Sequence, residues 1–154
     1  MPKAVAFDTS FVIGFLDDKD IWRAHALELE DVLFQGEFHE IIFDCVLAEA
    51  ISTLSRRFHE KRRSGDLADL FIRLEERFPK TQITWLYQDL SQLYDQVVGL
   101  VRETNGELNF NDALIAVSCR ERNIKFLASF DPDFDRIEWL TRISRLPDLN
   151  APAN

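Results

Sequence analysis

Short apolar runs alternate with segments of helical periodicity along almost the whole chain. Residues 3–7, 41–43, 81–85 and 125–128 are apolar or β-branched and have the length of buried β-strands. Between these runs, apolar residues recur at the spacing of amphipathic helices. Strands that alternate with helices predict an α/β fold, here a three-layer sandwich with a mostly parallel central sheet of four or five strands.

The helices are expected between and after these strands. They cover residues 11–16, 21–34, 45 to about 63, 67–78, 90–101 and 111–123. Residues 137–143 fit either an edge strand or a last short helix. Because the sequence shows neither an internal repeat nor a linker, we expect one domain over residues 1–146 and a frayed tail over residues 147–154.

Size and composition indicate a folded protein of the cytoplasm. The 154 residues are 46% apolar, which is enough for a hydrophobic core without a metal or a disulfide. Cys45 and Cys119 are too few for a disulfide framework, and we expect reduced thiols in the core. The apolar runs are too short to cross a membrane, and the few residues before Asp8 leave no room for a signal-peptide core. We therefore expect a cytoplasmic location and no membrane partner.

The chain is acidic, with 18 basic and 27 acidic side chains and a formal net charge of −9. This balance argues against a protein that holds nucleic acid by an overall positive potential. Two possibilities remain open: a local basic patch on an acidic protein, or an acidic site that binds cations.

Acidic residues stand close to the ends of the predicted strands. Asp8 follows the first strand, Glu49 lies one helical turn beyond the second, and Asp131 follows the fourth. Asp112 begins the helix that leads into the fourth strand. In a parallel sheet, sites form beyond the carboxyl ends of the strands, so we expect these acids to gather at one edge. Clustered carboxylates without His or Cys partners favour a hard cation such as Mg²⁺ or Mn²⁺, and such ions can activate water for phosphodiester cleavage.

Four motifs in this order resemble those of the PIN-domain ribonucleases, and among them the VapC-type toxins of toxin–antitoxin pairs. They stand at residues 5–10, 46–54, 111–116 and 126–134. Each motif alone is weak, but their order and spacing fit across residues 4 to 143.

The resemblance implies a PIN-like fold, an endoribonuclease dependent on Mg²⁺ or Mn²⁺, a homodimer, and an antitoxin partner that blocks the site. It implies metal binding by Asp8, Glu49 and Asp112. The fourth acid of the family usually falls where Asp131 stands, and Asp133 is the competing candidate. Ser10 matches a small polar position that helps to order the site.

One stretch of the third predicted helix is basic although the chain is acidic. It contains Arg56, Arg57, Lys61, Arg62 and Arg63. These residues lie two to four turns beyond Glu49, roughly 10–20 Å along a helix. That distance suits contacts with an RNA backbone near the scissile phosphate, but the cations could equally bind an acidic antitoxin segment or simply complement the helix dipole.

Other polar residues have simpler interpretations. Asp44 is better explained as an N-cap of the third helix than as a ligand. Asp17, Asp18 and Asp20 have the pattern of a solvated loop, and the phenylalanines are expected in the core rather than as base-stacking platforms. The three histidines lack the spacing of a zinc site.

Two functions other than a nuclease remain as alternatives. One is a catalytically silent PIN-like module that binds RNA or protein. The other is a phosphatase of the haloacid dehalogenase type, which also places an Asp after its first strand. Such enzymes need a second acid two residues later, where this chain has Ser10.

Overall fold

The apolar runs form one parallel sheet in the computed structural model, which describes residues 2–36 and 38–150. In spatial order its strands are β3 (Ile83–Thr84), β2 (Phe38–Phe43), β1 (Lys3–Phe7), β4 (Phe126–Ala128) and β5 (Thr141–Ile143). All four pairings between neighbouring strands are parallel, so the five carboxyl ends meet at one edge. The predicted α/β sandwich with a parallel sheet is confirmed.

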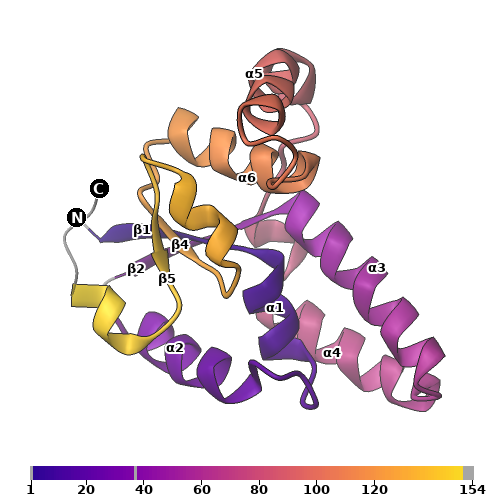
Figure 1. Ribbon diagram of the computed structural model, residues 1–154. Coiled ribbons are helices and arrows are strands. Elements are labelled where there is room, and N and C mark those ends of the chain that lie inside the picture. The colour runs from indigo at the N-terminus through magenta and orange to yellow at the C-terminus, as the bar shows by residue number, and fades with distance from the viewer. Residues whose placement is uncertain (1, 37, 151–154) are drawn as a thin grey trace.

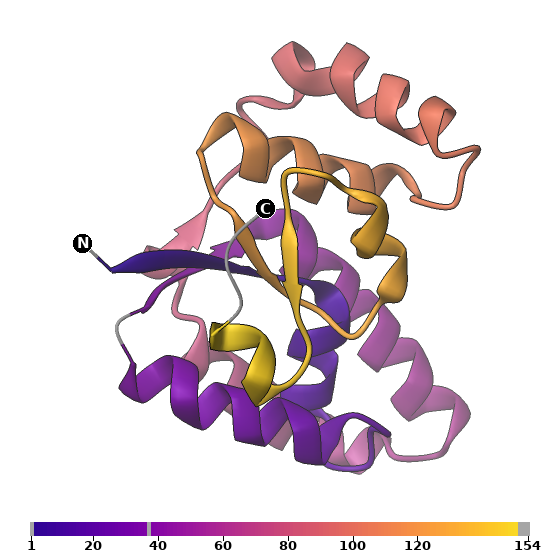
Figure 2. The ribbon, with the colours of Figure 1, turned by 60° about the vertical axis from the view of Figure 1, so that its left-hand side comes forward.

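Six α-helices connect the strands (Figure 1). They are α1 (Thr9–Leu16), α2 (Arg23–Gln35), α3 (Asp44–Glu60), α4 (Leu67–Arg77), α5 (Leu90–Glu103) and α6 (Phe110–Glu121). Figures 1 and 2 show α2 on one side of the sheet and α6, with α5 outside it, on the other. Within the described residues, no helix has the length and apolar character needed to cross a membrane.

Strand β1 is the topological switch point of the sheet. It pairs with β2 on one side and with β4 on the other, and the chain reaches these neighbours through helices on opposite faces. Crevices in open α/β sheets form beyond the carboxyl ends of strands at such a point. The residues that follow β1 and β4 are therefore placed together at the mouth of a crevice.

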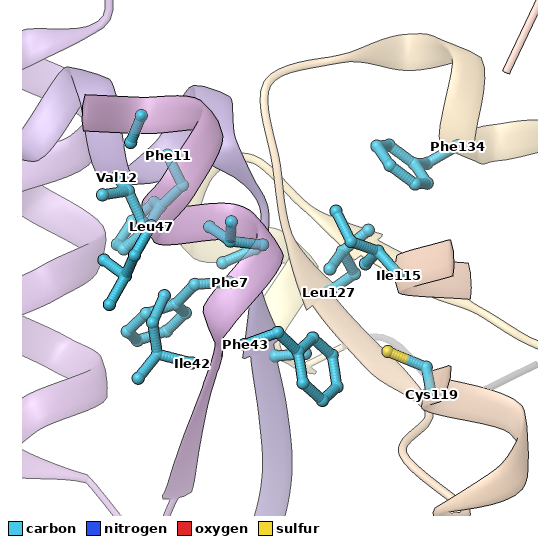
Figure 3. Close-up of a cluster of buried hydrophobic side chains, with 14 of the residues drawn as sticks. Phe7, Phe11, Val12, Ile42, Phe43, Leu47, Ile115, Cys119, Leu127 and Phe134 are labelled. Carbon is cyan, nitrogen blue, oxygen red and sulfur yellow. The ribbon is translucent and has the colours of Figure 1, made fainter. Parts of the chain in front are cut away.

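The core consists of side chains that project from the strands toward the helices. Figure 3 shows Phe7, Phe43 and Leu127 of the sheet with Leu47 of α3 and Ile115 of α6. All five are buried, and the ring of Phe43 is fully enclosed. Burial of a large apolar side chain contributes about 1.5–3 kcal/mol, so this cluster firmly fixes the positions of β1 and β4.

The two cysteines are free thiols, as expected. Cys119 is buried among core residues, whereas Cys45 is half-buried. Burial raises the pKa of each thiol to about 12, which keeps both in the unreactive protonated form at neutral pH.

Some helices and strands begin or end at residues other than those predicted. The third helix ends at Glu60 rather than near residue 63, because Arg62 adopts a positive φ of 55° that an α-helix does not allow. The third strand is only Ile83–Thr84, because residues 80–82 form a 3-10 turn. The uncertain segment 137–143 contains the edge strand β5.

The expected frayed tail is also partly ordered. Residues 146–150 form a 3-10 helix, and Leu149 packs against the core. Residues 151–154 of that expected tail lie outside the described residues.

Candidate active site

The junction between β1 and α1 places the first candidate acid at the crevice. Asp8 is only 3% exposed. Its backbone N–H donates to the carbonyl of Ala128 at 3.0 Å, and its own carbonyl accepts from the N–H of Val12 at 3.2 Å. The residue is thus tied both to the end of β4 and to the first turn of α1.

Two hydroxyl groups hold the Asp8 carboxylate in place. Ser10 and Ser129 donate to the same oxygen, Oδ2, at 2.8 and 2.7 Å. Ser10 in turn accepts from the N–H of Phe130 at 2.9 Å. Burial raises the pKa of the Asp8 carboxyl above its ordinary value, and the two serine hydroxyls oppose that rise by stabilising the charged form.

Glu49 on α3 faces the same crevice. Its Oε2 accepts from the hydroxyl of Thr9 at 3.2 Å and from the amide of Asn111 at 3.5 Å. Thr9 begins α1 and Asn111 lies in the first turn of α6. One carboxylate oxygen therefore joins three helices that are far apart in the sequence.

Asp112 lies at the start of α6, where it closes a capping box. Its N–H donates to the side chain of Asn109 at 3.0 Å, and its Oδ2 accepts from the N–H of Asn109 at 3.2 Å. Burial and the negative charges of Asp8, Glu49 and Asp131 raise the pKa of this carboxyl to about 7. The other three acids expected at this edge of the sheet are thus close enough to act on the charge of Asp112.

The loop after β4 supplies the fourth acid. The N–H of Asp131 is held by the Ser129 hydroxyl at 3.0 Å, and its Oδ1 accepts from the N–H of Asp133 at 2.9 Å. Asp131 is among the charges that act on Asp112, whereas the contact that the structure shows for Asp133 is this support of Asp131.

Comparison with known proteins assigns the chain to a family. The profile of the PIN domain matches residues 5–140. The chain belongs to the PIN-domain family. A search of curated protein sequences finds no significant match.

Two solved structures share the architecture of this PIN domain. VapC20 of Mycobacterium tuberculosis, described as a toxin that cleaves the sarcin–ricin loop, superposes with a TM-score of 0.64 at 23% identity, covering 86% of this chain and 93% of that one. VapBC2 of Rickettsia felis, solved with a DNA fragment from its promoter, gives a TM-score of 0.64 at 18% identity, covering 91% of this chain and 97% of the other. At these identities the likeness concerns the fold.

The donor set of the PIN domain suits a hard cation. The four acids offer only carboxylate oxygens, which Mg²⁺ and Mn²⁺ prefer, and their mutual repulsion is relieved by a positive ion. Within residues 2–36 and 38–150, no three acidic, histidine or cysteine side chains already converge as a metal-binding group. Instead, each of the four carboxylates is turned toward a hydroxyl, amide or backbone donor of the chain.

Only part of the predicted basic patch is exposed. Arg57 binds Asp17 and Asp20 at 2.9 and 2.8 Å, and Arg63 binds Asp17 at 3.0 Å. Arg63 also lies 4.1 Å over the ring of Phe58. Both arginines hold the α1–α2 loop against the end of α3, and a contact of either with RNA stays a prediction. The other three members of the patch, Arg56, Lys61 and Arg62, are exposed.

The expectation of a solvated loop at residues 17–20 was wrong. Asp17 is buried, with 1% of its side chain exposed, and the side chain of Asp20 is 8% exposed. Of the three acids, only Asp18, at 63%, is in solvent. The two arginines hold the pKa of the Asp17 carboxyl below its usual value although burial opposes this.

Asp44 is not an N-cap, because Phe43 occupies that position and Asp44 is already helical. Its carboxylate accepts from the N–H groups of Leu86 and Tyr87 at 3.0 and 3.2 Å, as well as from that of Cys45 at 2.9 Å. Asp44 thus fixes the loop that follows β3.

Sequence reasoning missed Thr9 and Ser129 as supports of the acids. Both are adjacent to a strand end, which is the one signal that could have identified them. Their role depends on contacts across 40 and 121 positions of the chain, which no local pattern encodes.

Proposed function

We propose that this PIN domain is a metal-dependent endoribonuclease and that residues 1–146 form its nuclease unit. The observation that carries the proposal is the placement of Asp8, Glu49, Asp112 and Asp131 beside the switch point of the sheet, where burial and the charges of the other three acids raise the pKa of Asp112 to about 7. The side chains that donate to the Asp8 and Glu49 carboxylates are hydroxyls and an amide, and such surroundings suit an oxygen-coordinated cation.

Mg²⁺ or Mn²⁺ would be held by Asp8, Glu49 and Asp112, with Asp131 as the fourth acid. A bound ion of this kind supplies an activated water and neutralises charge on the phosphodiester. Asp131 is favoured over Asp133 because its charge acts directly on Asp112.

The chain's own part is to hold the acids in position. Hydroxyl, amide and backbone groups do this: Ser10 and Ser129 orient Asp8, Thr9 and Asn111 orient Glu49, and the capping box fixes the backbone at Asp112.

We further propose that the nuclease is the toxin of a toxin–antitoxin pair and acts in the cytoplasm as a homodimer. Support comes from the likeness of its fold to VapC20, a toxin that cleaves the sarcin–ricin loop, and to the VapBC2 assembly. An antitoxin that covers the acids would block the site. A small reading frame beside the gene that encodes a DNA-binding protein would support this pairing.

The nuclease proposal is tested by Asp8→Asn, which keeps the shape of the side chain and both serine contacts but removes its charge. We expect loss of Mn²⁺-dependent cleavage of RNA together with retained folding, measured by gel assay and circular dichroism. Asp95→Asn, an exposed acid on α5, is the matched control and should cleave like the wild type. Full activity of the Asp8→Asn protein would refute the assignment.

The silent binding module makes a different prediction. In that case calorimetry would detect no Mn²⁺ binding at any concentration below about 10 mM, because no functional cation site would be present.

A further inference from the structure

Beside the candidate active site, one pair of stacked aromatic rings reaches from the core to the surface. The ring of Trp22 stacks on that of Phe130, with centroids 4.9 Å apart and an interplanar angle of 7°. Phe130 is buried, whereas Trp22, at the start of α2, keeps 37% of its surface exposed. The pair therefore presents an aromatic surface to solvent on a buried support.

This aromatic pair is joined to the candidate active site through the backbone. The N–H of Phe130 donates to Ser10, whose hydroxyl donates to the Asp8 carboxylate. Phe130 also stands next to Asp131 in the chain, so the pair lies beside the acids.

Several contacts hold Trp22 in position before any ligand arrives. The backbone N–H of Trp22 donates to the Asp20 carboxylate at 2.9 Å, and Asp20 binds Arg57 on α3. Beneath the pair lies Gly14 of α1, where an added Cβ would come within 3.4 Å of both Trp22 and Phe130. A side chain fixed in this way loses little conformational entropy when it binds a planar ligand.

Trp22 lines two hollows, one of which includes Ser10, the hydroxyl partner of Asp8. The first, of about 350 Å³, extends from Ser10 to Lys19 and Lys61. The second, of about 410 Å³, is bordered by Pro132 beside Asp131 and by Arg145. Trp22 lines both, and we call it with Phe130 the aromatic ridge.

The hollows carry positive charge in a chain of net charge −9. Lys19 and Lys61 are exposed, and the side chain of Arg145 is 71% exposed with a loose contact of 3.4 Å to Asp148. None of the described residues that line the second hollow is acidic. The acid that lines the first hollow, Asp20, is paired with Arg57, so a polyanion on either side of the ridge meets little negative charge.

We propose that the aromatic ridge binds single-stranded RNA next to the cleavage site, with an unstacked base on Trp22 and flanking phosphates at Lys19 and Lys61 on one side and Arg145 on the other. An exposed aromatic face between cations is the chemistry that binds single strands with little dependence on sequence. A duplex does not satisfy this geometry, because its bases are already stacked. This inference rests on the proposed ribonuclease function and names a substrate subsite for it.

The test measures binding separately from cleavage. Affinity for a fluorescein-labelled single-stranded RNA of about 12 nucleotides is determined by anisotropy in EDTA, so that the RNA is not cut. We expect Trp22→Ala to weaken binding roughly 5- to 100-fold, because the stacking of a base on an aromatic ring contributes a binding free energy of that size. Trp22→Phe should restore most of the lost affinity. The matched control is Phe34→Ala, which removes another exposed aromatic ring that lines neither hollow.

The cations are tested by salt dependence. Arg145→Gln should reduce the slope of log affinity against log salt concentration by about 0.7, as expected when one phosphate contact on a single strand is lost. Lys125→Gln, which changes an exposed cation outside both hollows, should leave the slope unchanged.

Two outcomes overturn the inference. One is an affinity of the Trp22→Ala protein equal to that of the wild type, which would show that Trp22 takes no part in RNA binding. The other is an equal loss in the Trp22→Ala and Phe34→Ala proteins, which would show no special role for the ridge. The wild-type cleavage assay keeps this result separate from the proposed function: absence of Mn²⁺-dependent cleavage refutes the nuclease, even if RNA still binds through Trp22.

Discussion

Asp17 is the most heavily paired acid of the α1–α2 loop, and its replacement by Asn should destabilise the protein. One of its oxygens accepts from Arg57 at 2.9 Å, and the other accepts from Arg63 at 3.0 Å and from the N–H of Lys19 at 3.1 Å. Asn keeps the size of the side chain and can still accept from Lys19. It cannot balance two guanidinium charges.

The expected loss of stability depends on the acidic partners that Arg57 and Arg63 retain. Removing one partner of a buried ion pair typically costs about 3–5 kcal/mol, because the other charge stays buried. Here Arg57 keeps Asp20 at 2.8 Å, and Arg63 keeps Asp18 at 3.2 Å. We therefore expect a smaller loss of about 2–3 kcal/mol in the free energy of unfolding, or a fall in Tm of roughly 4–12 °C for a domain of this size.

Urea denaturation at pH 7 measures this loss, with Asp18→Asn as the control. Asp18 is 63% exposed, so its replacement should change the free energy of unfolding by less than about 0.5 kcal/mol. The pKa of Asp17 is lowered by folding, so its contribution is present above the unfolded pKa near 3.8 and is lost as the pH falls through the folded pKa. A loss below about 0.5 kcal/mol at pH 7 for Asp17→Asn would refute the interpretation of Asp17 as a structural centre of charge.

Two further predictions concern other charges of the fold. Asp112→Asn should raise the free energy of unfolding at pH 8 in EDTA by about 1 kcal/mol, because a rise in pKa from 3.8 to about 7 corresponds to roughly 4 kcal/mol unscreened and this half-buried group is screened by water. Because folding raises the pKa of Asp112, the gain is small at pH 4 and grows as the pH rises from 3.8 to 7. A gain that does not depend on pH would contradict burial and charge repulsion as its cause. Arg77→Leu should cost about 3 kcal/mol, because Glu30 and Glu40 would remain half-enclosed without their shared partner, and a melting temperature equal to that of the wild type would contradict this.

The fold could be predicted from the sequence because its signals are local. The apolar run 3–7 and the stripe of helix α3 fix a strand and a helix by themselves, and their alternation predicts a parallel sheet. The predicted ends were wrong where the local preference for a strand or a helix competes with the geometry of the sheet. β-branched residues at 81–84 predicted a longer strand, but β3 lies at the edge of the sheet and pairs with β2 at only two positions. Element ends are the least determined part of such predictions.

Asp8 and Asp131 could be proposed as site residues because they stand shortly after strand ends, a position that the sequence shows directly, and their role stays a prediction. The partners of charged loops could not be predicted in this way. Asp17 and Arg57 are separated by 40 positions, and each alone has the pattern of a solvated charge. Only the crossing of α1 and α3, which depends on how apolar faces pack, brings them together. The basic stretch therefore resembles a nucleic-acid patch in the sequence, although two of its arginines serve the loop.

This pairing also changes the meaning of the net charge of −9. Among the described residues, salt bridges neutralise acids mainly away from the crevice, at Asp17, Glu30 and Asp135, for example. The candidate metal ligands instead receive hydroxyl, amide and backbone donors, which orient a carboxylate without cancelling its charge. Negative potential is thereby concentrated at the one place where a divalent cation is proposed to act. An RNA phosphate would be repelled by the same four acids, so both a cation at the acids and the positive side chains Lys61 and Arg145 beside Trp22 would strengthen RNA binding.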